Sequence, residues 1–568
     1  MSERVEFECN GDPVEVDVEP GESLLSVLRE RLRLTSVKDG CAPQGQCGCC
    51  TVLVDDGARV ACVTPATRVR GRRVTTLEGL DADRRDQIAD AFLAHGASQC
   101  GFCTPGIVMR CSVLVDAGRA GDRTAVDHAL AAHLCRCTGW LGIVDALSEL
   151  AEVADGGARA SRVSRAARDL DAASQRASIE GGAPQRVSRQ VVLGEGGFAD
   201  DAAVRAAGER DDILVAVPAG DEYAVAASLH EARVAAAKVQ GRRTSIALAP
   251  PIAPAPCEPG GVALATSWVE PAYLEPDASW RAPGGEPASP LANGGAFGGK
   301  ESSPVVDEVA ALGAERGRTV RVVWSREDVV RRGPKRPPFS ARAHFDGPRV
   351  VITGRGPVAP IVPPSPYGID IDVQWDTIAV DGPAVSHAMR APFAEAAVLV
   401  EGALDEAGFD RNAVVGGLAA AALLDTCVAD PGGGVAGARV ELAPHTGALG
   451  AVHVRVACGR LLDDVVVRSY CTGAVHMALG WVLREGIAVD ADGVVHDLTI
   501  RSFGILRAKD MPPVTIELVD DDRAPCRASD AVFAAAAAAC WNALARAEGT
   551  RPHTFPARDT RAAQLLRR

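Results

Sequence analysis

The sequence predicts a multidomain α+β chain in which a small β-grasp domain and a four-helix domain precede a larger α+β region. Two quartets of cysteines fall before residue 138, and the pattern around them changes from alternating to helical between the first quartet and the second. Beyond them, short Val-rich strands alternate with Ala-rich helices over residues 191–568. At 568 residues the chain is long enough for several domains, each with its own core.

The first part of the chain has the pattern of a β-grasp domain. Residues 4–9 and 14–18 alternate apolar and polar side chains on either side of an Asn-Gly turn, which is typical of a β-hairpin. Helical spacing follows over residues 23–32, and Asp-Asp-Gly at residues 55–57 separates two short apolar runs. We therefore expect a ferredoxin-like domain over residues 1–78.

The cysteines of this domain have the spacing C-x5-C-x2-C-x11-C, close to the plant-type ferredoxin spacing C-x4-C-x2-C with a distant fourth cysteine. One extra residue in the first loop is the difference. The two-residue gap after Cys47 selects Cys50 as a ligand, and an exchange of roles between Cys49 and Cys50 stays open. The predicted ligands of the first 2Fe-2S cluster are Cys41, Cys47, Cys50 and Cys62.

The second quartet has the spacing C-x2-C-x31-C-x1-C and predicts a helical 2Fe-2S-binding domain over residues 79–153. Thr104-Pro105 supplies a cap and a first-turn proline for one helix. Helix amino termini aimed at the quartet would bring positive dipole ends to an anionic centre. The four expected helices cover residues 83–93, 107–115, 125–134 and 143–153. The predicted ligands are Cys100, Cys103, Cys135 and Cys137.

Other thiolate sites have to be weighed against iron-sulfur clusters. Zinc also takes four cysteines, and a CxxC pair can be a redox dithiol. Eleven of the 17 cysteines fall before residue 138, whereas incidental core cysteines would be scattered along the chain. Two unlike quartets in neighbouring domains favour two 2Fe-2S clusters, with zinc left as the alternative.

Three segments around these cysteines, GCAPQGQCGCCTVLVDDG, QCGFCTPGIV and LCRCTGW, give the chain a family resemblance. Over residues 1–150 it resembles the 2Fe-2S module of the xanthine dehydrogenase and aldehyde oxidase family of molybdenum hydroxylases. The resemblance implies two 2Fe-2S clusters, and it implies that Gln99 hydrogen-bonds the pterin of a molybdenum cofactor. In this family no protein side chain binds the molybdenum directly, so the absence of a His/Cys cluster after residue 138 is no objection to the resemblance.

The rest of the chain resembles a shortened form of the family's molybdopterin-binding subunit. Residues 154–190 are rich in Ala, Arg, Ser and Gly and are expected to be a linker, followed by a shortened α+β molybdopterin-binding-like region over residues 191–568. Within it, NGGAFGGK at residues 293–300 resembles a glycine-rich cofactor loop of the family, whose backbone amides would be available to oxo ligands or phosphates. The cofactor-binding residues proposed from this loop are Gly294, Gly295, Phe297 and Gly298.

Two residues are candidates for catalysis by resemblance. Arg390, in the segment MRAP, matches the family's substrate segment and would orient a carbonyl or stabilise developing negative charge; a surface arginine beside a proline turn is the alternative. The family's catalytic glutamate corresponds to Asp530, which has one methylene fewer and would act as the general base. Ser529 or Asp530 as a helix cap is the alternative at that position.

Composition and charge limit the partners and the location. A net charge of −14 argues against nucleic acid or an anionic membrane surface as a partner. No stretch reaches the roughly 18 apolar residues of a membrane span, and the amino terminus leads directly into a strand instead of a signal peptide. Because thiolate chemistry needs a reducing compartment, we expect a cytoplasmic protein, and an oligomer is compatible with the sequence.

Two hypotheses on function follow. In the first, the chain is a molybdenum hydroxylase-like oxidoreductase that oxidises a small-molecule substrate, an aldehyde or a purine-like N-heterocycle, at a molybdopterin centre. A carboxylate accepts a proton, and two electrons leave singly through the clusters to an external acceptor. No GxGxxG fingerprint follows a strand, so FAD is not expected in this chain and a flavin subunit is one candidate acceptor. In the second, the chain is an electron-transfer or assembly component with intact clusters and a catalytically degenerate molybdopterin-like domain.

Overall fold

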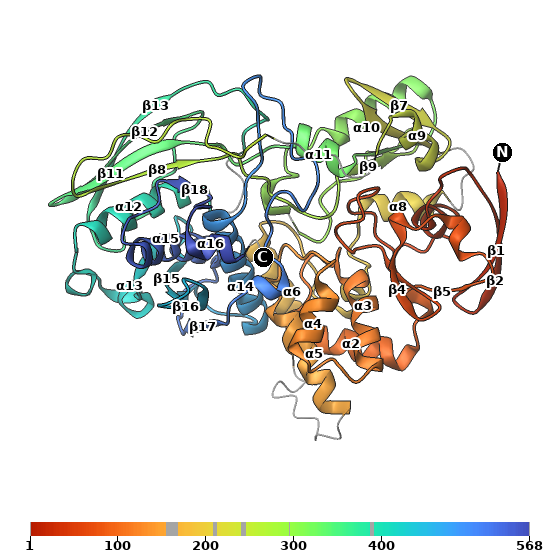
Figure 1. Cartoon of the computed structure of the whole chain (residues 1–568), viewed down its shortest axis with the longest axis horizontal. Coiled ribbons are helices and arrows are strands. Elements are labelled where there is room, and N and C mark those ends of the chain that lie inside the picture. The colour runs from red at the N-terminus through yellow and green to blue at the C-terminus, as the bar shows by residue number, and fades with distance from the viewer. Residues whose placement is uncertain are drawn as a thin grey trace.

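Figure 1 presents the computed structural model of the chain, in which two amino-terminal domains and a small sheet adjoin a larger region of two sheets and long helices. The structure describes residues 2–154, 168–207, 213–239, 246–294, 296–386 and 391–566.

The β-grasp domain expected at the amino terminus is confirmed. Its five strands lie in the order β2-β1-β5-β3-β4, with β1 and β5 parallel and the other pairs antiparallel. A short helix, α1 (Leu24–Ser26), continues into a π-helical turn at Val27–Arg31 and covers one face of the sheet. The strands are β1 (Glu3–Cys9), β2 (Asp12–Val18), β3 (Thr51–Val54), β4 (Gly57–Val60) and β5 (Arg73–Thr75).

The four predicted helices of the second domain are also present, at the lower centre of Figure 1. The second begins at Thr104, directly after Cys103, with Pro105 in its first turn. The third ends at Leu130, four residues before the predicted end, because the backbone N–H of Leu134 donates to Cys47 O at 3.0 Å instead of continuing the helix. The helices are α2 (Ala82–Ala94), α3 (Thr104–Asp116), α4 (Arg123–Leu130) and α5 (Leu141–Ala154).

The described part of the predicted linker differs from the expectation, because it contains regular structure. Helix α6 (Leu170–Gly181) begins at an Asp169 cap and packs Ala173 and Ala177 against α14 (Asp464–Leu483). Its contact face consists of small residues, which gave no clear apolar period in the sequence. Two short helices follow, α7 (Arg189–Val192) and α8 (Ala199–Ala206).

A small mixed sheet, at the upper right of Figure 1, has the order β7-β6-β10-β9. Its central strands are Val-rich and buried, as expected when helices cover both faces of a sheet. The strands are β6 (Leu214–Ala219), β7 (Glu222–Ala226), β9 (Ala278–Arg281) and β10 (Val320–Val323), and the helices around them are α9 (Leu229–Ala235), α10 (Val305–Arg316) and α11 (Arg326–Arg332).

The largest part of the chain places helices between two sheets, at the left of Figure 1. The upper sheet has the order β13-β12-β11-β8-β18 and packs on α12, and the lower sheet has the order β14-β15-β16-β17 and packs on α14 and α15. The upper strands are β8 (Gly261–Thr266), β11 (Ser340–Asp346), β12 (Arg349–Gly356), β13 (Asp370–Thr377) and β18 (Thr554–Phe555). The lower strands are β14 (Thr426–Ala429), β15 (Val435–Leu442), β16 (Leu449–Ala457) and β17 (Val514–Val519). The remaining helices are α12 (Ala394–Glu406), α13 (Gly417–Ala422), α15 (Ser529–Glu548) and α16 (Arg561–Leu565).

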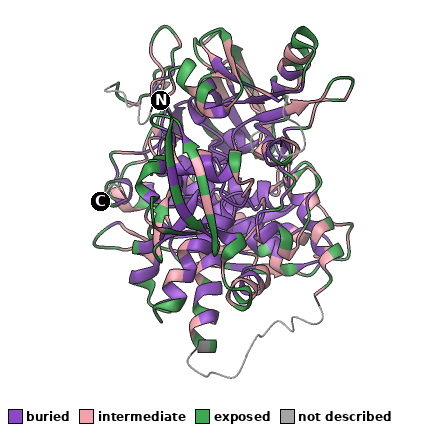
Figure 2. Ribbon diagram, turned by 90° about the vertical axis from the view of Figure 1, so that its right-hand side faces the viewer, coloured by how far each residue is buried: buried purple, intermediate pink, exposed green. Residues whose placement is uncertain are grey.

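Burial explains the alanine run of α15. Every residue from Ser529 to Leu544 is buried, so the helix has no solvent face along this stretch. Figure 2 shows the same distribution for the whole molecule, with buried segments through the interior and exposed ones at the periphery. A helix enclosed on all sides is apolar around its whole circumference, and alanine lets neighbouring elements approach closely.

In the part of the chain that the structure describes, no helix combines the length and the apolar character that crossing a membrane requires.

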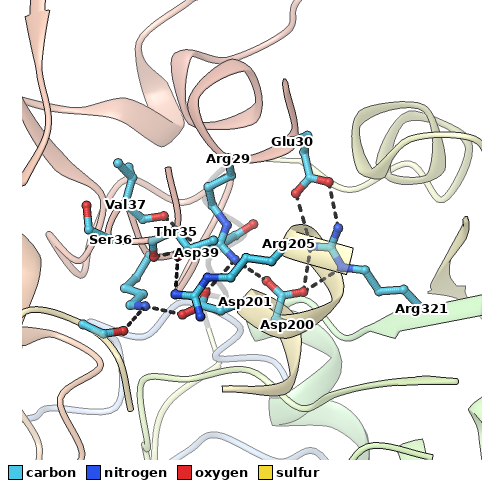
Figure 3. A network of polar contacts seen from close by, with 12 residues as sticks. Arg29, Glu30, Thr35, Ser36, Val37, Asp39, Asp200, Asp201, Arg205 and Arg321 are labelled. Atoms are coloured by element: carbon cyan, nitrogen blue, oxygen red, sulfur yellow. Dashed lines mark hydrogen bonds and ion pairs between the residues drawn. The ribbon is translucent and has the colours of Figure 1, made fainter. Parts of the chain in front are cut away.

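A buried network of charges joins the β-grasp domain to the elements that follow the linker (Figure 3). The Arg29 side chain, 2% exposed, donates to Asp200 at 2.7 Å and to Asp201 at 2.9 Å. Asp201 also receives the ammonium of Lys38, which is fully buried. Arg321 on β10 contacts Asp200 at 2.7 Å and Glu30 at 2.7 Å. Although burial acts to raise the pKa of Asp200, the two arginines lower it to about 2.

We expect Asp201→Asn to destabilise the contact between the β-grasp domain and α8. The substitution leaves two buried cations without their shared carboxylate, and breaking a buried pair in this way costs about 3–5 kcal/mol. Urea unfolding followed by circular dichroism measures the change.

Asp17→Asn is the control, because it faces Arg4 on an exposed hairpin where both side chains are more than half exposed. An exposed pair contributes about 1 kcal/mol or less. Equal shifts of the unfolding transition in the two variants would contradict a stabilising role of the buried network.

Candidate functional site

The thiols of the first cysteine quartet converge in a buried loop. The Cys41 thiol is within hydrogen-bonding contact of the Cys47 and Cys62 thiols, and Cys62 is in contact with Cys50. All four residues are at most 5% exposed. The backbone N–H groups of Gln46 and Cys47 point at Cys41 Sγ, with distances of 3.2 and 3.3 Å. Such amides stabilise thiolate sulfur, so the loop can hold an anionic cluster.

Cys49 also touches this group of thiols. Its thiol is in contact with that of Cys47, and its Sγ lies 3.9 Å from Cys47 O. Cys50, by contrast, reaches Cys62 directly, and Cys62 N donates to Cys50 Sγ at 3.4 Å. This arrangement supports the prediction that Cys50 is the ligand.

The second quartet converges in the same manner at the amino end of α3. Cys100 contacts Cys137, Cys103 contacts Cys135, and Cys135 also contacts Cys137. Hydrogen bonds from Cys103 and Cys137 hold the pKa of the Cys135 thiol well below its usual value. In the described residues, no three or more His, Cys, Asp or Glu side chains surround a single point where one metal ion could lie. A two-iron cluster spreads its four thiolates over two iron atoms instead.

The two quartets are held against each other by backbone packing. A Cβ on Gly106, in the first turn of α3, would lie 2.3 Å from Gly48 O and 2.8 Å from Cys49 O. His133 lies over Gly48 and contacts Thr51 Oγ1 through Nε2 at 3.0 Å. Burial lowers the pKa of His133 to about 3, so it is neutral at pH 7. The two cluster loops are therefore packed directly against each other.

The helical domain packs equally closely on α14 of the second half. A Cβ on Gly473 would lie 1.8 Å from Cys137 O. Gln99 Nε2 donates to Cys137 O at 2.9 Å and to Ser469 Oγ on α14 at 3.0 Å. Arg136 forms a bidentate ion pair with Glu485, with distances of 2.6 and 2.7 Å. Gln99, which the resemblance assigns to the pterin, thus lies where the cluster domain meets the second half.

A pocket opens at this junction. It encloses about 900 Å³ of empty space, part of it continuous with solvent. Cys100, Cys103 and Cys137 form one wall, the NGGAFGGK loop forms another, and Asp530 reaches it from the start of α15. Residues far apart in the sequence are therefore brought together around one pocket.

The glycine-rich loop is positioned by its asparagine. Asn293 Oδ1 accepts from Arg186 N at 2.6 Å, and Asn293 Nδ2 donates to Gln99 O at 2.9 Å. Gly294 has φ +128°, which only glycine adopts without strain, and Gly298 has φ +82°. Phe297 is left-handed at φ +58°. These three residues line the pocket, whereas Gly295 lies outside the described residues.

Asp530 does not cap α15. The helix starts after Ala528 without a side-chain cap, and the Glu180 carboxylate accepts from the N–H groups of Ala528 and Ser529 at 3.0 Å each. The capping role left open for Ser529 or Asp530 therefore belongs to Glu180. Asp530 is 5% exposed and faces the pocket, where Arg527 Nη1 lies 3.2 Å from its Oδ2.

Sequence reasoning missed several polar residues of the pocket. Tyr470 OH donates to Gln185 Oε1 at 2.5 Å, and Glu275 pairs with Lys300, the last residue of the glycine-rich loop, at 2.7 Å. Burial raises the pKa of Glu275 to about 7 although Lys300 opposes the shift. Glu180 and Gln185 fall in the predicted linker and carried no motif, whereas Lys300 was part of one. Arg390 lies outside the described residues.

Three protein families match parts of the chain. The 2Fe-2S iron-sulfur cluster binding domain matches residues 7–73, the [2Fe-2S] binding domain matches residues 76–148, and the molybdopterin cofactor-binding domain matches residues 383–512.

Curated relatives match the amino-terminal part. The chain is 40% identical over 148 residues to the nicotine 6-hydroxylase small subunit of Paenarthrobacter nicotinovorans, covering 26% of this chain and 89% of that protein. It is 40% identical over 149 residues to the xanthine dehydrogenase iron-sulfur-binding subunit of Escherichia coli O157:H7, covering 25% and 92%. Among solved structures, the aldehyde oxidoreductase of Desulfovibrio desulfuricans aligns with a TM-score of 0.70 at 16% identity, covering 99% of both chains, and shares the fold.

The neighbouring cysteines Cys49 and Cys50 give a matched test of the first cluster. Cys50→Ser should remove or strongly alter one of two 2Fe-2S EPR signals in the reduced protein, because a ligand thiolate is lost. Cys49→Ser should leave both signals, since Cys50, which contacts Cys62, is the predicted ligand. EPR at low temperature with iron analysis makes the measurement, and the reverse result would exchange the roles of the two residues.

Proposed function

Because this chain belongs to the xanthine dehydrogenase and aldehyde oxidase family of molybdenum hydroxylases, we propose that it oxidises an aldehyde or a purine-like N-heterocycle at a molybdopterin centre. The electrons would leave through two 2Fe-2S clusters to an external acceptor. The observation that carries the proposal is the pocket, in which Cys100 and Cys137, the glycine-rich loop and the Asp530 carboxylate meet.

The residues around the pocket suit a pterin. A pterin ring presents alternating hydrogen-bond donors and acceptors, and in the pocket Gln99 Oε1 can accept while Gln185 Nε2 can donate. Gly294 leaves space beside the loop, because a Cβ there would lie 3.1 Å from Gln185 Nε2. Arg527 supplies a cation for a phosphate. No side chain needs to reach the molybdenum, which the pterin carries.

In the proposed reaction the bound cofactor supplies the two-electron oxidation and the oxygen transfer. Asp530 holds and moves the proton, as a general base that must lie within hydrogen-bonding reach of the reacting group. Glu180 helps to set the position of Asp530, since it accepts from the N–H groups of Ala528, just before α15, and of Ser529, its first residue. Arg527 Nη1 donates to Asp530 Oδ2 at 3.2 Å and helps to orient the carboxylate. The pocket wall at Cys100 and Cys137 gives the electrons a direct exit to the cluster domain.

A second function remains a candidate because of one substitution. Asp530 is one methylene shorter than the family's glutamate, and a displacement of about 1 Å can lower a rate on the order of a hundredfold. The chain would then transfer electrons or assist assembly without turning over substrate at the pocket.

Metal analysis distinguishes the two functions. We expect about four iron atoms, as two 2Fe-2S clusters, together with near-stoichiometric molybdenum in the purified protein. Inductively coupled plasma mass spectrometry and an assay for acid-labile sulfide make the measurement. Iron without molybdenum would exclude the enzyme and favour the second function.

Asp530→Asn tests the proposed base. Removal of a general base lowers kcat by about 10²- to 10⁴-fold. The assay uses benzaldehyde and hypoxanthine as substrates and an indophenol dye as the acceptor. The molybdenum content and both EPR signals should stay unchanged, since the residue is not a predicted metal ligand.

Asp346→Asn, an exposed carboxylate on β11, is the control and should leave kcat unchanged. Full activity in Asp530→Asn would remove Asp530 from the mechanism.

A further inference from the structure

The chain carries a buried cation between two predicted ligands of the second cluster. Arg136 follows Cys135 and precedes Cys137, and it is 4% exposed. Together with Cys137 it also lines the cofactor pocket. A charge close to a cluster changes the reduction potential, because the reduced cluster carries one more negative charge than the oxidised one. Whether the charge of Arg136 is balanced therefore matters for electron transfer.

The carboxylate that balances this cation comes from the second half of the chain. Glu485, just past the end of α14, accepts from Arg136 Nη1 at 2.6 Å and from Nη2 at 2.7 Å. Arg136 Nε donates to Pro271 O at 3.0 Å, so all three nitrogens of the guanidinium are engaged. The paired side chains are 4% and 2% exposed, and such a buried pair is only weakly screened by water and salt.

Helix α14 is built to bring this carboxylate to the cluster domain. Gly473 and Gly480 are seven residues apart and so lie on one face of the helix. A Cβ on Gly473 would lie 1.8 Å from Cys137 O, and a Cβ on Gly480 would lie 2.0 Å from Glu485 Oε1. The face of α14 that contacts the cluster loop thus also holds the carboxylate that pairs with Arg136.

A histidine on the same helix adds no charge to this region. His476 is fully buried, and burial together with the nearby Arg136 lowers its pKa, so the ring is neutral at pH 7. Its Nε2 lies 2.9 Å from Leu506 O. The charge of Arg136 is therefore met by Glu485 and not offset or increased by His476.

We propose that Glu485 lowers the reduction potential of the second cluster by neutralising Arg136. The second cluster receives each electron first, since Cys100 and Cys137 form a wall of the cofactor pocket. An unbalanced cation beside it would stabilise its reduced state and hold the electron there, whereas the intact pair lets the electron pass on to the first cluster. Glu485 is thus a positioning residue that acts through Arg136. The proposal rests on the proposed function only for the direction of electron flow.

A redox titration measures this effect on the clusters themselves. The full-length protein is titrated with dithionite in the presence of mediator dyes, and the two 2Fe-2S EPR signals are followed at low temperature. The signal that persists in Cys50→Ser identifies the second cluster. Because dithionite supplies the electrons directly, the titration needs neither substrate nor molybdenum.

Glu485→Gln removes the negative charge with little change of shape. We expect the equilibrium constant for reduction of the second cluster to rise about tenfold, which is about 59 mV for a one-electron couple. Glu485→Asp keeps the charge and should stay close to the unmodified protein. The control is Glu401→Gln, which breaks a buried pair with Arg411 of 2.9 Å on α12, at the left of Figure 1 and away from the helical domain, and should shift neither potential.

Arg136→Gln separates the effect of charge from that of packing. It leaves a buried carboxylate unbalanced, so the potential of the second cluster should fall instead of rise. The combined variant Arg136→Gln with Glu485→Gln carries neither charge and should return close to the unmodified potential. A merely structural role of the pair would shift both single variants in the same direction, and the combined variant would not reverse the shift.

Three results would overturn the proposal: an unchanged second potential in Glu485→Gln, shifts of equal sign in the two single variants, or loss of the second EPR signal in both of them. Each is read from the clusters alone. A protein that holds iron without molybdenum would contradict the proposed oxidation but would still titrate as described here. Failure of this proposal and failure of the proposed function are therefore distinguishable.

Discussion

Close backbone contact at two glycines holds the redox part of this chain in place. Gly106 brings the first turn of α3 against the loop of the first quartet, and Gly473 brings α14 against the carbonyl of Cys137. Any side chain at these positions would push the elements apart, because the nearest atoms belong to rigid backbone. The position of each quartet relative to the other, and of both relative to the cofactor pocket, depends on these two contacts.

The amino-terminal fold could be predicted because its signals are local. Turn residues, the cysteine spacing and the helix start at Thr104-Pro105 each act within a few residues of one another. The cofactor pocket was predictable only in part, from the glycine-rich loop and Asp530. The cap of α15 shows why: its acceptor, Glu180, lies 348 residues from Ala528 in a segment without a motif. Contacts at that separation leave no pattern in a single sequence.

The same reasoning applies to the charges. Arg29 and Asp200 are separated by 171 residues, and each alone looks like an ordinary surface residue. In the fold they are buried against each other, and their contact joins the β-grasp domain to α8. When charged side chains are buried together, their hydrogen bonds hold them in one orientation. The attachment of one domain to another depends on such fixed side chains.

The packing of α6 on α14 has a consequence for how the protein is made. Two of the relatives described above are named as subunits, and each covers about a quarter of this chain. Here one translation product carries the parts that match the cluster-binding and the cofactor-binding domains. A covalent connection replaces a bimolecular equilibrium by a high effective concentration, so dilution does not separate the two. Their stoichiometry is set by the gene and not by expression levels.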